Sequence, residues 1–132
     1  MAAADVSRNA QMTRFKTLTR YLLGFLFVLA GINHFANTAM YVSIMPPYLP
    51  WPLELVYVSG VAEMTLGVLL LFLRCATWAA WGLVALCVAV FPANLHMALH
   101  AELYPSLPSW GLWVRLPLQG LLIAWAWWYT RE

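Results

Sequence analysis

Charged side chains are almost missing from the middle of this chain. Residues 21–130 carry five of them: Glu54, Glu63, Arg74, Glu102 and Arg115. Charged residues make up 9% of the whole chain and hydrophobic residues 64%, whereas soluble domains average about 25% charged residues. So few charges cannot cover a soluble surface. This excludes an ordinary soluble domain, a disordered chain and a nucleic-acid-binding protein, and it predicts an integral membrane protein whose main partner is the lipid bilayer.

Four apolar segments reach the length of about 20 residues that a helix needs to cross a bilayer. They are residues 18–36, 53–73, 75–99 and 111–129. Their apolar runs do not alternate, which excludes the strands of a membrane β-barrel. We therefore predict an all-α fold, with a four-helix transmembrane bundle over residues 17–132 and a basic cytoplasmic head over residues 1–16.

The cations predict how the bundle is oriented. With four spans, both termini lie on one side of the membrane together with Arg8, Arg14, Lys16, Arg20, Arg74 and Arg131. The other side has only Arg115. Because cytoplasmic loops carry an excess of Lys and Arg, we expect cytoplasmic termini, Pro-rich connections outside (residues 37–52 and 100–110), and a location in a bacterial inner membrane. The sequence leaves the oligomeric state open.

Polar groups within the spans are costly and therefore candidates for function. Most lie within about two turns of the outer helix ends, Gln119 lies deeper, and Glu63 lies near the midplane. We expect almost no comparable group in the inner half. The pattern predicts a polar pocket that opens outward, with these ligand-binding residues: His34, Glu63, Asn94, His96, Arg115 and Gln119.

Glu63 is the best candidate for a catalytic or proton-carrying group. Ser59, Gly60 and Gly67 share its helix face, so a ligand or another backbone can approach closely. A structural ion pair between Glu63 and Arg115 is the competing interpretation. Arg115 could instead extend to the outer lipid headgroups, because it lies near a helix end.

A metal site has weak support. His96 and His100 have the i, i+4 spacing that can chelate one metal, but histidines bonded to loops or water explain the pair more simply, so no metal site is predicted. Cys75 and Cys87 lie about 18 Å apart along one helix, so neither a disulfide nor a dithiol enzyme is expected. Residues 45–52 (MPPYLPWP) either cap the pocket or rest on the headgroups.

Five short motifs in order resemble the DoxX-like family of small four-helix membrane proteins. The motifs are GINHF at 31–35, IMPPYLPWP at 44–52, SGVAE at 59–63, FPANLHM at 91–97 and VRLPLQ at 114–119. The resemblance covers about residues 18–130, and His100 lies outside its pattern. It implies a redox-associated membrane protein and makes a quinone, or a small sulfur or oxygen species, a candidate ligand. It implies no settled mechanism.

Three functions remain open from the sequence. The first is a redox-associated subunit or enzyme that binds a small ligand, with a quinone as the candidate cofactor and other membrane redox subunits as candidate partners. The second is a structural or assembly partner without chemistry. The third is a small proton-coupled transporter, which the apolar inner half disfavours.

Overall fold

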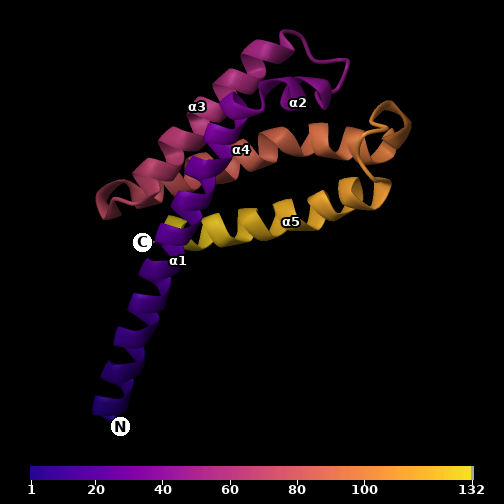
Figure 1. Ribbon diagram of the computed structural model, residues 1–132. Coiled ribbons are helices and arrows are strands. Elements are labelled where there is room, and N and C mark those ends of the chain that lie inside the picture. Colours follow the sequence, from indigo (N-terminus) through magenta and orange to yellow (C-terminus); the bar gives the residue numbers. More distant parts are fainter. Residues whose placement is uncertain (132) are drawn as a thin grey trace.

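The computed structural model describes residues 1–131, and these residues contain helices and no strand. The predicted all-α class is therefore confirmed. Four long helices form the body of the molecule: α1 (Ala2–Ala36), α3 (Pro52–Leu70), α4 (Leu73–Leu99) and α5 (Ser109–Trp128). Shorter elements complete the fold: α2 (Thr38–Ser43), η1 (Ala101–Leu103) and η2 (Tyr129–Arg131) (Figure 1).

The long helices form two antiparallel pairs, α1 with α3 and α4 with α5, and α3 also contacts α4 (Figure 1). One buried apolar cluster includes Leu23 of α1, Leu70 of α3, Leu83 of α4 and Tyr129. A second lies where α4 and α5 are connected and includes Tyr104. The N-terminal half of α1 extends away from the other helices (Figure 1). The residues predicted as a basic head are thus helical and continuous with the first long helix.

Glycines bring α1 and α3 into backbone contact. A Cβ atom at Gly24 would lie 2.7 Å from the carbonyl oxygen of Gly67, and one at Gly31 would lie 2.6 Å from that of Gly60. Such distances leave no room for a side chain at these positions. Because Gly24 and Gly31 are seven residues apart, as are Gly60 and Gly67, the contacts recur every two turns along one face of each helix.

Arg20 is the main departure from the predicted distribution of polar groups. Its side chain is buried, with 3% of the residue exposed, and Nη1 donates a hydrogen bond of 2.5 Å to the carbonyl oxygen of Leu70. Leu70 is the last residue of α3, where carbonyl oxygens lack helical partners. Arg20 thus fastens α1 to the end of α3, whereas the sequence analysis counted it only among the cations at the helix ends.

Three helices among the described residues are long and apolar enough to cross a membrane: α1, α3 and α4. Large apolar side chains also face outward on all the long helices, including Phe25, Val58, Val88 and Leu121. Such surfaces are unfavourable in water and suit contact with lipid, as expected for an integral membrane protein. A helix of 20 residues, α5, also occupies the fourth predicted span, but it is not among these three.

The connection between α1 and α3 is more ordered than its prolines suggest. Residues 38–43 form helix α2, which the sequence analysis did not predict. Trp51 precedes Pro52 with a φ of 49°, a left-handed conformation that is rare for a bulky residue. The next residue, Pro52, is the first of α3. The conformation of Trp51 therefore determines the direction in which residues 44–50 approach α3.

Candidate ligand-binding site

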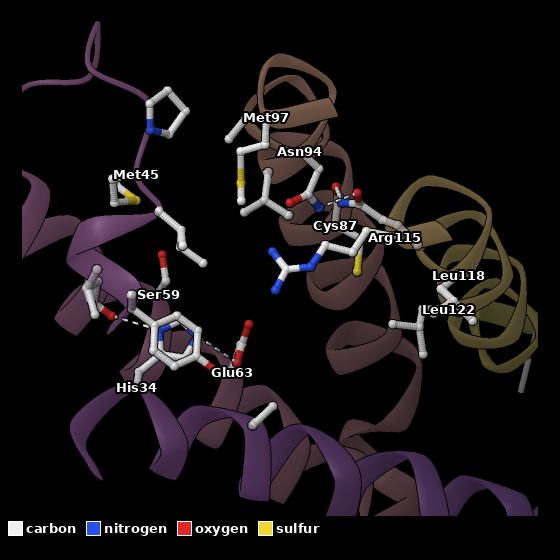
Figure 2. Close-up of a pocket in the computed structure, with 18 of the residues that line it drawn as sticks. His34, Met45, Ser59, Glu63, Cys87, Asn94, Met97, Arg115, Leu118 and Leu122 are labelled. Carbon is white, nitrogen blue, oxygen red and sulfur yellow. Dashed lines mark hydrogen bonds and ion pairs between the residues drawn. The ribbon is translucent and has the colours of Figure 1, made fainter. Parts of the chain in front are cut away.

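A cavity of about 370 Å³ lies between the two helix pairs. That volume falls within the range of about 300–1,000 Å³ typical of small-molecule sites. Each long helix contributes a stripe of residues spaced three or four apart, as in Cys87, Val90, Asn94 and Met97 of α4. The polar side chains in the lining are His34, Tyr41, Ser59, Glu63, Asn94, Arg115 and Gln119 (Figure 2).

The five motifs of the sequence analysis all contribute residues to this cavity. The segment at 44–52 supplies Ile44, Met45 and Pro46. Its first part therefore forms a wall of the cavity, which favours the cap over a segment that only rests on headgroups. The contributions of the other motifs are His34, Ser59, Glu63, Ala93, Asn94, Met97, Arg115, Leu118 and Gln119.

His34 and Glu63 face each other across the contact between α1 and α3. Nδ1 of His34 lies 3.0 Å from the carbonyl oxygen of Val56, and Nε2 lies 3.4 Å from Oε2 of Glu63. The ring also stacks on Tyr41 of α2, with ring centroids 4.1 Å apart. Oε2 of Glu63 is buried and has no hydrogen-bond partner among the described residues, so its contact with His34 is the 3.4 Å approach alone. The glycine contact at Gly31 holds the two helices at this separation.

The contact with Val56 determines what this pair can do chemically. A carbonyl oxygen only accepts hydrogen bonds, so Nδ1 of His34 must carry a hydrogen atom. A neutral imidazole then presents a lone pair at Nε2, which would repel a Glu63 carboxylate. The favourable arrangements place one proton between Nε2 and Oε2, either on the carboxyl group or on the ring. The pair is then neutral overall and presents one exchangeable proton to the cavity.

Arg115 of α5 points into the cavity, toward the side where Glu63 lies (Figure 2). It does not extend to the outer headgroups, which was one interpretation of its position. It also forms no ion pair with Glu63, which was the other. Within residues 1–131 its guanidinium group has no hydrogen bond or ion pair, so its five N–H donors remain available to a ligand.

Asn94 and Gln119 bond to each other across the α4–α5 contact. Nδ2 of Asn94 donates a hydrogen bond of 2.7 Å to Oε1 of Gln119, and Nε2 of Gln119 donates to the carbonyl oxygen of Cys87. Since Gln119 is buried and both of its polar atoms are used, it fixes the wall of the cavity. Asn94 keeps a free carbonyl oxygen at the cavity surface (Figure 2).

His96 was predicted with these ligand-binding residues, but it lies outside the cavity lining. It follows Asn94 by two positions, about 200° around the helix, and so faces the opposite way. Its ring packs against Tyr48 and stacks on His100, with centroids 4.9 and 4.3 Å away. The Tyr104 hydroxyl lies 3.5 Å from its Nδ1, and burial raises the pKa of that tyrosine.

His96 and His100 are also the two residues that the sequence analysis considered as weak metal ligands. Nδ1 of His100 lies 3.1 Å from the carbonyl oxygen of His96 and so is occupied by its own helix. Within the described part of the chain, no group of three His, Cys, Asp or Glu residues is placed to hold a metal ion.

Tyr41 is the site residue that sequence analysis missed. It lies in α2, stacks on His34 and accepts a hydrogen bond of 2.8 Å from Nδ2 of Asn33. The available signal was its position seven residues after His34, which would place both on one face if the helix continued. The four prolines that follow made a loop the simpler prediction.

Comparison with known proteins gives a family without an assigned activity. No curated protein and no solved structure matches the chain significantly. The sequence model of one family, described as "Domain of unknown function (DUF8561)", matches residues 23–130. That match spans most of the chain and includes every polar residue that lines the cavity. The chain therefore belongs to the DUF8561 family.

Proposed function

We propose that the chain is a DoxX-like protein of a bacterial inner membrane that binds a small ligand in the cavity and takes part in redox chemistry. The observation that carries this proposal is the unpaired guanidinium group of Arg115, which faces the proton-sharing pair of His34 and Glu63. Arg115 is half-buried, and an arginine within a membrane-spanning helix is costly when its guanidinium group has no partner. A ligand oxygen at this position would remove that cost. The redox association rests on the five motifs, all of which contribute to the cavity.

In this proposal α5 is a fourth membrane span and both termini are cytoplasmic. Two hydrogen bonds connect the ends of the helices on that side. Arg20 donates to the carbonyl oxygen of Leu70, and the Tyr129 hydroxyl donates a hydrogen bond of 2.7 Å to Oγ1 of Thr19. Arg115 faces the cavity, and the two outer connections contain no Lys or Arg. The excess of cations on the cytoplasmic side is therefore larger than it is when Arg115 is counted on the outer side, and it supports the same orientation more strongly.

The orientation is tested with single cysteines in a variant whose two natural cysteines are replaced by serine. We expect Ser106→Cys, in the connection before α5, to react in intact cells with a thiol reagent that does not cross membranes. Ser7→Cys, near the N-terminus, should react only after lysis. The reverse pattern would contradict the orientation, and reaction of both in intact cells would contradict the three spans between these two positions.

Ligand binding is tested by native mass spectrometry of protein extracted in a mild detergent. We expect a bound small molecule in the wild-type protein and its loss in Arg115→Gln. In the same preparation, a short-tailed benzoquinone should bind and quench tryptophan fluorescence. Protein that contains no small molecule and binds no quinone, sulfur or oxygen species would argue against this function and favour a structural role.

A further inference from the structure

The charges in the cavity narrow the class of ligand. Its titratable groups are His34 of α1, Tyr41 of α2, Glu63 of α3, Cys87 of α4 and Arg115 of α5. With one proton between His34 and Glu63, the arrangement that their contact favours, that pair adds no net charge. Tyr41 and Cys87 are neutral in their ordinary protonated forms. Arg115 therefore leaves the cavity with one uncompensated positive charge.

The donors in the cavity also outnumber the acceptors. The Arg115 guanidinium group has no partner among the described residues, and the Ser59 hydroxyl likewise lines the cavity without a hydrogen bond in the described chain (Figure 2). Donors that converge from α3 and α5 suit a ligand oxygen that accepts hydrogen bonds, and a negatively charged oxygen accepts them most strongly.

Most of the remaining lining is apolar. The walls are formed mainly by apolar side chains of all four long helices and of the segment after α2, including Phe27, Ile44, Val56, Met97 and Leu122. An inorganic oxyanion would have to lose its hydration shell against these side chains, and a second negative charge would have no partner. An apolar ring system would instead cover them favourably.

We infer that the ligand is an amphiphilic organic monoanion, in which an apolar body carries one carboxylate, enolate or phenolate oxygen. The oxygen binds Arg115 and Ser59, and the body lies against the apolar walls. This inference rests on the proposed ligand-binding function and selects among its ligands: it favours an acidic ring compound over a sulfur oxyanion. Binding forms and breaks no covalent bond, and the negative charge of the ligand neutralises the positive charge of the cavity.

Two ligands of nearly equal shape test the inference, 1-naphthoate and its neutral amide, 1-naphthamide. Binding of each is measured by isothermal titration calorimetry to the full chain in lipid nanodiscs, with empty nanodiscs as the blank. We expect the anion to bind about ten- to hundredfold more tightly than the amide, as for a charge-assisted hydrogen bond. Arg115→Gln should abolish this preference, and Arg115→Lys should keep most of it.

Arg14→Gln, which removes an exposed arginine outside the cavity, is the matched control and should leave both affinities unchanged. Gel filtration and circular dichroism establish that each variant is folded. Equal binding of the two ligands, or a preference that survives in Arg115→Gln, would overturn the inference. So would thiosulfate that binds more tightly than naphthoate. If the amide or a quinone binds while the anion does not, the ligand-binding function stands and only its charge selectivity fails.

Discussion

Replacing Gly31 by alanine tests the helix contact that places His34 beside Glu63. The added Cβ atom would lie 2.6 Å from the carbonyl oxygen of Gly60 and 2.9 Å from the backbone nitrogen of Met64. Since ordinary contacts begin near 3.4 Å, α1 and α3 would have to separate by about 0.8 Å, and overpacking of this kind costs about 1–3 kcal/mol. Alanine also favours helix over glycine by about 1 kcal/mol, so we expect a net loss of up to about 2 kcal/mol, and a stability about 1–3 kcal/mol below that of an alanine substitution at an open glycine.

Gly120→Ala is the matched control, because no atom lies within 4 Å of the Cβ position at this glycine of α5. It should be neutral or stabilise by up to about 1 kcal/mol through helix propensity alone. The free energy of unfolding is measured in mixed micelles of dodecyl maltoside with increasing SDS. A Gly31→Ala variant that is as stable as Gly120→Ala would refute the backbone contact, and with it the reason given for the position of His34.

Two further predictions concern buried polar groups. Arg20→Gln should lower the free energy of unfolding by about 1.5–3 kcal/mol, the value of a charged hydrogen bond, in the same SDS titration; an unchanged midpoint would mean that the bond to Leu70 does not form. Gln119→Leu should cost about 1–3 kcal/mol, because Asn94 loses its partner, and wild-type stability would show that water replaces it freely.

The class of fold and the grouping of the polar residues were predictable from the sequence for a common reason. Scarce charge and long apolar runs leave few alternatives to membrane helices, and each predicted span contains one long helix. Polar groups at similar depths, such as His34 and Arg115, were then expected to meet, and both line the cavity.

The partners of those groups were not predictable, because depth along a helix does not determine direction around it. His96 matches Asn94 in depth but faces the opposite side of α4. Glu63 contacts His34 and not Arg115, because glycines allow α1 closer to α3 than α5 comes. Arg20 looked like one of several cytoplasmic cations, and only its position opposite the end of α3 shows why it is buried.

We propose that Arg115 and the pair of His34 and Glu63 form a ligand site between the two helix pairs. Anomalous diffraction from crystals of the protein grown with 4-bromo-1-naphthoate tests it most directly, because the bromine locates the ring without ambiguity. The account predicts one strong peak among the apolar walls of the cavity, with the carboxylate within hydrogen-bonding distance of Arg115. An empty cavity at saturating ligand, or bromine only on the lipid-facing surface, would contradict it.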